Sequence, residues 1–351
     1  MTEDNATDAR IAPIAQVRLG TDGPLVGVQG LGCMGMSEFY GGTDEGAARA
    51  TLDAALDAGV TLFDTADMYG RGANERFLAP FLARHRDEVT IATKFAIDRS
   101  VDGSSDVEVR HVRNDPAYIR RAVDDSLQRL GVDVIDLYYM HRRDPAVPLA
   151  DSVGAMAELV RAGKVRHLGL SEVTGAELRE AHAVHPIAAL QSEWSLFSRD
   201  VEGEHTAVSA AAELGVAFVP YSPLGRGFLA GAFTDAAKEL AEGDFRHQQP
   251  RFTGDNARAN AELLAPVRAI AEAHGATPGQ VALAWVQQQA DVHGLPVVPI
   301  PGTRKASRVR ENAAATRVRL TADELARLEP IAAKVVGDRY ANMAGTSADR
   351  E

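Results

Sequence analysis

The sequence predicts an α/β fold, a (β/α)8 TIM barrel with an N-terminal β-hairpin and extra C-terminal helices. Three observations predict it. The expected strands are short and apolar on both faces, as in buried parallel sheets. An amphipathic helical segment follows each strand, and about eight such units occur in a row. Eight successive βα units are typical of a closed barrel.

The elements follow in chain order. Residues 15–18 and 25–28 flank a Thr-Asp-Gly turn and are expected to form the hairpin. Strands are expected at 28–33, 61–64, 89–94, 134–141, 166–171, 189–194, 217–221 and 297–301. Helices are expected at 43–58 with Thr43 as N-cap, and at 74–85, 116–130, 149–161, 175–182, 206–214, 257–273 and 278–289. Two more helices, 306–315 and 322–333, follow, and a capping box of Thr321 and Glu324 opens the second.

The chain is expected to form one domain, residues 15–335, between a polar leader at 1–14 and a polar, loosely held C-terminal tail at 336–351. Two connections, 96–116 and 224–255, are longer than usual. Both leave the carboxyl ends of strands, where the active site of such a barrel lies. We therefore expect these two loops to surround the site.

The composition of the chain limits the classes of partner that the protein is expected to bind. The 351 residues carry a net charge of −12, with a pI near 5.4. Because nucleic acid and anionic membranes attract basic surfaces, neither is expected as a partner. Cys33 is the single cysteine, which excludes an intramolecular disulfide, and we expect no metal site. The leader lacks the basic and apolar blocks of a signal peptide, and no apolar run reaches the length of a membrane span, so a cytoplasmic protein is expected.

Polar side chains follow three of the expected strands. Asp64 ends the second strand and Tyr69 follows it, Lys94 ends the third, and His141 ends the fourth. The carboxyl ends of barrel strands converge on one rim, so the four side chains are expected to meet there. A lysine ammonium beside a phenol lowers the pKa of the phenol and makes it a usable proton donor. Asp64 would hold Lys94 in place, and His141 would hydrogen-bond the substrate oxygen.

This set suits protonation of a carbonyl oxygen, but no side chain delivers hydride, so a nicotinamide cofactor is implied. The run Gly30-x-Gly32-x-x-Gly35 matches a dinucleotide fingerprint, yet the expected helix begins only near residue 43. We interpret Gly32, Cys33 and Met34 instead as a backbone edge close to the cofactor. A better phosphate site is the basic segment 299–312, which places a Gly-Thr turn and several arginines at a helix N-terminus.

In this order and at these strand ends, the four residues resemble the catalytic tetrad of the aldo-keto reductases. The resemblance extends through Gly-Leu-Ser at 169–171, Gln191, the run Tyr-Ser-Pro-Leu-Gly at 221–225 and the 302–312 block. It implies NADPH as cofactor, with Tyr69 as general acid. It also implies the cofactor contacts: Ser171 and Gln191 on the carboxamide, Tyr221 stacked on the nicotinamide, Ser222, Leu224 and Arg226 along the pyrophosphate, Gly302 and Thr303 in the phosphate turn, Arg304 and Arg308 on the 2′-phosphate, and Glu311 and Asn312 on the adenine.

One residue departs from that pattern. Glu172 stands where many family members have asparagine, and a carboxylate cannot donate to the carboxamide oxygen. The two long loops most resemble those of the microbial branch that includes pyridoxal-reductase-like and general aldehyde reductases.

The predicted function is NADPH-dependent reduction of a small carbonyl substrate, an aldehyde or a ketone, to an alcohol, by a monomer or homo-oligomer. An NADPH-binding regulatory subunit with negligible turnover is the alternative, and a barrel acting on a phosphorylated substrate is a third reading.

Overall fold

The computed structural model describes residues 12–99, 111–231, 239–240 and 242–350, and its centre is a sheet of seven parallel strands. The strand order is β11-β10-β9-β8-β5-β4-β3. The strands are β3 (Leu31–Gly32), β4 (Leu62–Asp64), β5 (Thr90–Phe95), β8 (Ile135–Met140), β9 (Val165–Ser171), β10 (Ile187–Glu193) and β11 (Ala217–Tyr221). Their order matches the predicted succession of βα units.

The segment 297–302 closes the barrel between β11 and β3. Val297 pairs with Phe218, and Gly302 pairs with Gly32, both as isolated parallel bridges. The amide of Gly30 also donates to the carbonyl of Pro299 at 2.9 Å. The prediction of a full strand at 297–301 was therefore wrong in detail, because the prolines in this segment have no N–H to donate to a continuous ladder.

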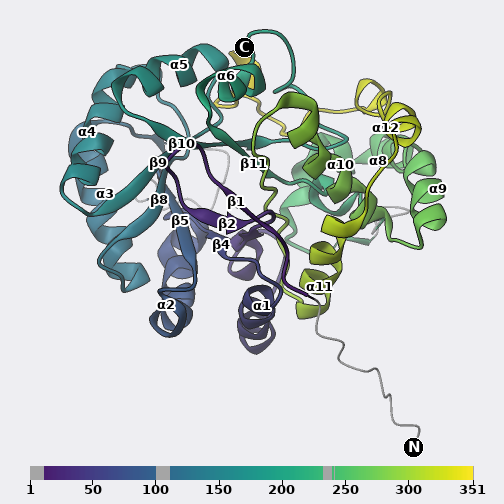
Figure 1. Cartoon of the computed structure of the whole chain (residues 1–351), viewed down its shortest axis with the longest axis horizontal. Coiled ribbons are helices and arrows are strands. Elements are labelled where there is room, and N and C mark those ends of the chain that lie inside the picture. The colour runs from purple at the N-terminus through teal and green to yellow at the C-terminus, as the bar shows by residue number, and fades with distance from the viewer. Residues whose placement is uncertain (1–11, 100–110, 232–238, 241, 351) are drawn as a thin grey trace, which may run out of the picture.

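Helices surround the strands (Figure 1). They are α1 (Glu45–Asp57), α2 (Ala73–His85), α3 (Pro116–Leu130), α4 (Leu149–Arg161), α5 (Gly175–Val184), α6 (Ala207–Leu214), α8 (Gly254–Glu262), α9 (Ala265–His274), α10 (Pro278–His293), α11 (Ala306–Ala314) and α12 (Ala322–Leu328). The capping box of Thr321 and Glu324 is confirmed. Asp44, not Thr43, caps α1, because its carboxylate accepts from the amide of Ala47 at 2.8 Å.

The helix predicted at 257–273 is instead two helices, α8 and α9. Pro266 lies in the first turn of α9. Proline has no N–H and clashes with the preceding turn of a helix, so a continuous helix through this position is disfavoured.

An N-terminal hairpin of β1 (Gln16–Arg18) and β2 (Leu25–Gly27) lies across the centre of the ring of strands (Figure 1). Leu19 and Val26 are fully buried and pack in one cluster with Leu62 and Leu137 from the barrel strands. The predicted hairpin is thus confirmed, and its apolar side chains fill one end of the barrel. A second antiparallel pair, β6 (Ile97–Asp98) and β7 (His111–Val112), lies in the long connection after β5.

The C-terminal tail departs most from prediction. Arg339, Thr346 and Ser347 are each at most 3% exposed, so the tail beyond residue 336 is not loosely held. Arg339 pairs with the Glu172 carboxylate on the barrel rim, which also accepts from the Ser347 amide, and the Thr346 hydroxyl donates to the carbonyl of Met343. These contacts account for the burial of a polar segment. Residues 1–11 of the predicted leader, 1–14, lie outside the described residues.

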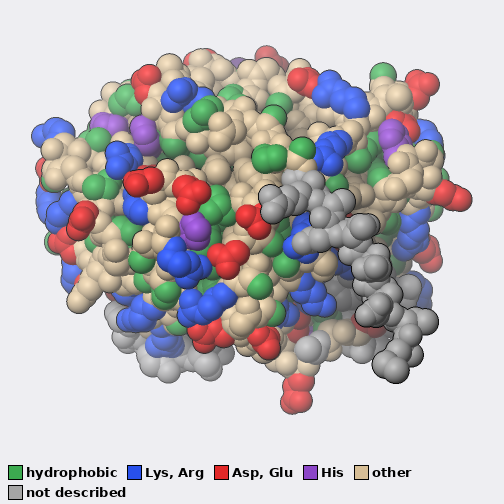
Figure 2. All heavy atoms as spheres, turned by 60° about the horizontal axis from the view of Figure 1, so that its bottom comes forward, with side chains coloured by type: hydrophobic (Ala, Val, Ile, Leu, Met, Phe, Trp, Pro, Cys, Tyr) green, Lys and Arg blue, Asp and Glu red, His purple; other side chains and the backbone are tan. Residues whose placement is uncertain are grey.

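Acidic and basic side chains are interspersed over the face in Figure 2, so the net negative charge does not gather there into one acidic field. Among the described residues, no helix is long and apolar enough to cross a membrane. In the same part of the chain, no three histidine, cysteine or acidic side chains cluster as a metal site would require.

Candidate active site

Three adjacent strands bring Asp64, Lys94 and His141 together. Asp64 is the last residue of β4, Lys94 lies one residue before the end of β5, and His141 follows β8 directly. These strands are neighbours in the sheet, and β5 pairs with both others. All three side chains are buried. The convergence predicted from the strand ends is therefore what the barrel produces.

The ammonium of Lys94 is the centre of this group. It is fully buried and donates to the carboxylate of Asp64 and, at 2.9 Å, to the carbonyl of Thr65. Burial lowers the pKa of Lys94 from its ordinary value, and the Asp64 carboxylate opposes that effect. The second oxygen of Asp64 accepts from Nε2 of Gln191 at 2.8 Å. Asp64 thus both fixes and neutralises the lysine.

Tyr69 lies over this pair at the start of a 3-10 turn, Tyr69–Gly72. The Lys94 ammonium is 5.3 Å from the centre of the Tyr69 ring, and the His141 ring stands edge-on to it at 5.9 Å. Gly70 has a left-handed φ of 56°, which glycine adopts at little cost, and its amide donates to Glu38 at 2.8 Å. This turn folds Tyr69 back toward the strand ends.

The predicted cofactor residues on β3 lie beside the tetrad. Gly32 pairs with Asp64 on one side and with Gly302 on the other. The amide of Cys33 donates to the carbonyl of Asp64 at 2.8 Å, while burial raises the pKa of its thiol and keeps the thiol protonated. Met34 packs against the cluster that includes Tyr69.

The predicted nicotinamide residues lie at the ends of the next strands. Ser171 ends β9 and accepts from Nη1 of Arg142 at 3.3 Å. Tyr221 ends β11, and Ser222 and Leu224 follow it, partly buried. Arg226 pairs with the buried Glu193 at 3.1 Å, so this arginine has a protein partner as well as its predicted role on the pyrophosphate.

The predicted phosphate segment is the N-terminus of α11. Lys305 is the N-cap residue of this nine-residue helix, and its side chain makes no capping hydrogen bond. The backbone N–H groups of the first turn therefore receive no acceptor from the N-cap side chain. Thr303 accepts from the amide of Lys305 at 3.2 Å. Backbone donors, Arg304 and Arg308 together form a donor set that fits a phosphate.

Several residues of this segment also contact the protein. Arg304 donates to the carbonyls of Tyr40 at 3.0 Å and of Gly42 at 2.6 Å, which ties the loop before α1 to α11. Arg308 pairs with Glu311 at 2.5 Å, and Asn312 is buried. The sequence did not indicate the contacts of Arg304, because they join segments about 260 residues apart in the chain.

Sequence reasoning missed Arg142, which lies next to His141 in the chain. It is buried and donates to the His141 carbonyl at 2.7 Å. Its guanidinium is within electrostatic range of Tyr69 and also of Tyr221 and Tyr340. Adjacency to His141 was the signal that could have identified it.

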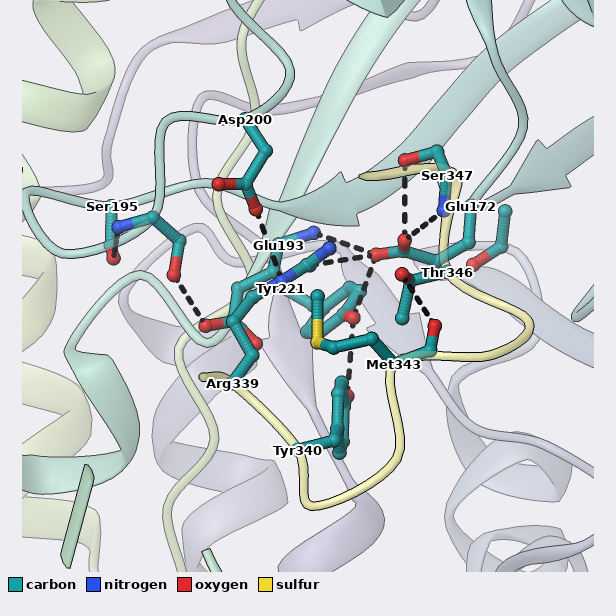
Figure 3. A network of polar contacts seen from close by, with 12 residues as sticks. Glu172, Glu193, Ser195, Asp200, Tyr221, Arg339, Tyr340, Met343, Thr346 and Ser347 are labelled. Atoms are coloured by element: carbon teal, nitrogen blue, oxygen red, sulfur yellow. Dashed lines mark hydrogen bonds and ion pairs between the residues drawn. The ribbon is translucent and has the colours of Figure 1, made fainter. Parts of the chain in front are cut away.

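Glu172 does not lie as an open ligand for a carboxamide. Its carboxylate is fully buried and accepts from the hydroxyl of Tyr221 at 2.7 Å, from Arg339 at 3.2 Å and from the amide of Ser347 at 2.9 Å (Figure 3). Its uncertain contact with the cofactor is thus replaced by contacts with the C-terminal tail.

Comparisons with known proteins agree with this geometry. A sequence profile of the Aldo/keto reductase family matches residues 30–333. The glycerol dehydrogenase AKR11B4 from Gluconobacter oxydans is 28% identical, with 92% of this chain and 96% of that chain covered and a TM-score of 0.78. The thermostable aldo-keto reductase Tm1743, solved with the inhibitor epalrestat, is 26% identical over 91% of this chain and all of that chain, with a TM-score of 0.70. The match spans every strand of the barrel, and the chain belongs to the aldo-keto reductase family of oxidoreductases.

Proposed function

We propose that this protein reduces aldehydes or ketones to alcohols with NADPH, and that Tyr69 is the general acid. The observation that carries the proposal is the fully buried ammonium of Lys94, held by Asp64 and 5.3 Å from the centre of the Tyr69 ring. A buried cation costs free energy unless it is paired. Here the ammonium is paired with Asp64 and also lies over the Tyr69 ring.

The chemistry divides among four side chains. When bound, the nicotinamide supplies a hydride to the carbonyl carbon. Tyr69 donates its phenolic proton to the carbonyl oxygen, and the Lys94 ammonium stabilises the phenolate that remains. His141 donates a hydrogen bond to the same oxygen and orients it. Asp64 keeps Lys94 charged despite its burial.

The cofactor would be held along the rim from β9 to α11. Ser171 and Gln191 would bind the carboxamide, the Tyr221 ring would stack on the nicotinamide, and Arg226 would contact the pyrophosphate. Arg304 and Arg308 would bind the 2′-phosphate at the open N-terminus of α11, which is the reason to propose NADPH over NADH. Glu311 and Asn312 would contact the adenine.

The test is turnover. Purified protein is mixed with NADPH and a panel of aldehydes, and the absorbance of the reduced nicotinamide is followed. Glyceraldehyde belongs in the panel because one similar structure is a glycerol dehydrogenase. The Tyr69→Phe variant keeps the ring and loses the acid. If the wild type oxidises NADPH no faster than this variant on every substrate, the proposal is wrong, and NADPH binding without turnover would favour a regulatory subunit.

The remaining parts of the proposal concern partners and location. We propose that the substrate is a small carbonyl compound and that the protein works in the cytoplasm as a monomer or homo-oligomer, without nucleic acid or membrane partners. Size-exclusion chromatography with light scattering would measure the oligomeric state.

A further inference from the structure

The turn that carries Tyr69 has an unusual backbone. Gly70, Arg71 and Gly72 follow one another with φ of 56°, 53° and 82°, all in the left-handed region. Glycine adopts such a φ at little cost, but Arg71 does not, and a non-glycine residue stays there only where its surroundings hold it. Within the turn, the amide of Arg71 donates to the carbonyl of Met68 at 3.1 Å. A conformation of this kind needs further contacts from outside the turn.

Two charged side chains hold the peptide units on either side of Tyr69. The carboxylate of Glu38 accepts from the amide of Gly70 at 2.8 Å. Nη1 of Arg99 donates to the carbonyl of Met68 at 3.0 Å and to both carboxylate oxygens of Glu38, each at 2.8 Å. We call Glu38 and Arg99 together the clamp. Its two contacts fix the backbone immediately before and immediately after Tyr69.

The clamp joins three segments of the rim that are separate in the chain. Glu38 lies in the loop between β3 and α1, Arg99 follows β6, and the turn follows β4. The side chains of Glu38 and Arg99 are 24% and 14% exposed, so the ion pair is partly shielded from water. Hydrogen bonds to charged groups are stronger than those between neutral groups, and partial burial strengthens them. The contacts of the clamp with the turn are therefore stronger than ordinary loop hydrogen bonds.

Both ends of the clamp are themselves held in place. Two residues after Glu38, the carbonyl of Tyr40 accepts from Nη2 of Arg304 at 3.0 Å, which ties this loop to α11. At the other end, the carbonyl of Arg99 accepts from Nη1 of Arg71, in the turn itself, at 3.2 Å. The clamp can therefore transmit the position of the surrounding rim segments to the turn.

The position of this turn matters for the chemistry because a proton donor acts only within hydrogen-bond reach of its acceptor. The Tyr69 ring has the Lys94 ammonium 5.3 Å from its centre and the His141 ring edge-on to it. A small rotation of the backbone at Tyr69 displaces the phenol oxygen, at the far end of the side chain, more than it displaces the backbone. Fixing both flanking peptide units restricts this rotation.

We propose that Glu38 and Arg99 are positioning residues, and that the clamp they form holds the turn so that the Tyr69 phenol meets the carbonyl oxygen of the substrate within hydrogen-bond reach. Both side chains act through the backbone and not on the substrate. The catalytic half of this inference rests on the proposed reductase activity, whereas the anchoring half does not.

The anchoring is tested without turnover, by amide hydrogen exchange of the peptide spanning residues 66–72. Glu38→Ala removes the acceptor of the Gly70 amide and should raise exchange in this peptide at least about tenfold, relative to the rest of the chain. Arg99→Ala should also raise it, because the Met68 carbonyl and Glu38 lose their shared donor. Unchanged exchange in both variants would overturn the anchoring.

Asp136→Asn is the matched control. Asp136 pairs with Arg86 at 2.9 Å and accepts from the amide of Ile91 at 2.9 Å. Arg86 donates to the carbonyl of Val134 at 2.8 Å, so this ion pair also holds one backbone amide and one backbone carbonyl. It lies at the opposite end of β8 from His141. Asp136→Asn should lower global stability and leave exchange of peptide 66–72, relative to the rest of the chain, unchanged. An equal rise in this control would overturn the anchoring, because general destabilisation would explain it.

The effect on catalysis is tested by separating kcat from binding. Arg99→Gln should lower kcat for aldehyde reduction about tenfold and change the KM for the aldehyde and the Kd for NADPH less than about threefold each. The solvent deuterium isotope effect on kcat should rise, because proton donation becomes slower. Arg99→Lys keeps a charged donor and should recover part of the loss. A raised KM with an unchanged kcat would overturn the proposal, since the clamp would then act on substrate binding.

Exchanging the two charges separates positioning from simple ion pairing. Glu38→Arg combined with Arg99→Glu restores an ion pair, but it places a donor against the Gly70 amide and an acceptor against the Met68 carbonyl. The double variant should therefore recover thermal stability and keep the low kcat. Recovery of kcat together with stability would overturn the positioning, because the ion pair alone would then suffice. If the wild type itself reduces no aldehyde, the proposed function fails, and hydrogen exchange still decides the anchoring.

Discussion

Lys94→Met separates the structural and the chemical contribution of the buried ion pair. Methionine has a similar length and no charge, so it leaves the Asp64 carboxylate buried with Gln191, at 2.8 Å, as its remaining side-chain donor. Breaking a buried pair by removing one partner costs about 3–5 kcal/mol, whereas replacing both partners by neutral groups is often close to neutral. We therefore expect Lys94→Met to lose about 3–5 kcal/mol of unfolding free energy, and Asp64→Asn with Lys94→Met to lose about 1 kcal/mol.

Denaturant unfolding near neutral pH measures both losses, and NADPH-dependent aldehyde reduction is measured on the same preparations. The double variant should regain stability and remain inactive, because no ammonium is left beside the Tyr69 ring. Two results would refute the reasoning. Equal losses of stability in the single and double variants would mean that the pair is not electrostatically coupled, and reductase activity in the double variant would mean that Lys94 does not assist Tyr69.

Three further predictions follow from other contacts. Arg304→Ala should raise the KM for NADPH about tenfold more than the KM for NADH. Loss of the contacts with Tyr40 and Gly42 affects binding of both cofactors, whereas loss of a ligand to the 2′-phosphate affects NADPH alone. An equal rise in the two KM values would count against a role on the 2′-phosphate. The stability difference between wild type and Glu172→Gln should be about 3 kcal/mol near neutral pH, since the Glu172 pKa falls from 4.5 to about 2 on folding. A carboxyl group whose pKa is lowered on folding stabilises the fold above about pH 4.5, and this stabilisation is lost as the pH falls toward about 2. The stability difference between wild type and variant should therefore shrink by about 2 kcal/mol between neutral pH and about pH 3. Denaturant unfolding at several pH values measures this, and a difference that stays constant with pH would contradict it. Gly169→Ala should lower the free energy of unfolding by about 2 kcal/mol, because the added methyl group meets the buried Tyr139 ring. Gly154→Ala in α4 places its methyl group in open space and should raise the free energy of unfolding by about 0.5 kcal/mol. Thermal unfolding of both variants tests this, and a neutral Gly169→Ala would contradict the packing.

The order of the elements was predictable because each carries its own pattern. A strand that is buried on both faces consists of consecutive apolar residues, and a helix on the outside of a barrel has apolar residues at helical spacing along one face. The failures occurred where backbone donors decide the outcome. Prolines near residues 297–301 prevent a continuous ladder, and Pro266 separates α8 from α9. These prolines and their positions are visible in the sequence, so both details could have been predicted from the rule that proline has no N–H to donate.

The meeting of Asp64, Lys94 and His141 was predictable for a topological reason. Parallel strands in one barrel place their carboxyl ends on the same rim, so a polar residue at each end reaches the others whatever the loops do. The partners of Arg226 and Arg304 were not predictable in this way. Each guanidinium has five donors and a long side chain, and its choice among nearby acceptors depends on loops whose conformations the sequence pattern does not specify.

The buried carboxylates at the rim explain why the polar tail was misread. Glu172 and Glu193 lie at the ends of β9 and β10 and are at most 1% exposed. Charges buried to this degree require paired cations. For these two carboxylates the cations come from segments outside the strands: Arg339 from the tail pairs with Glu172, and Arg226 from the loop after β11 pairs with Glu193. A carboxylate at the buried end of a strand therefore predicts a paired cation, which comes from the neighbouring strand β5 for Asp64 and from segments distant in the chain for Glu172 and Glu193.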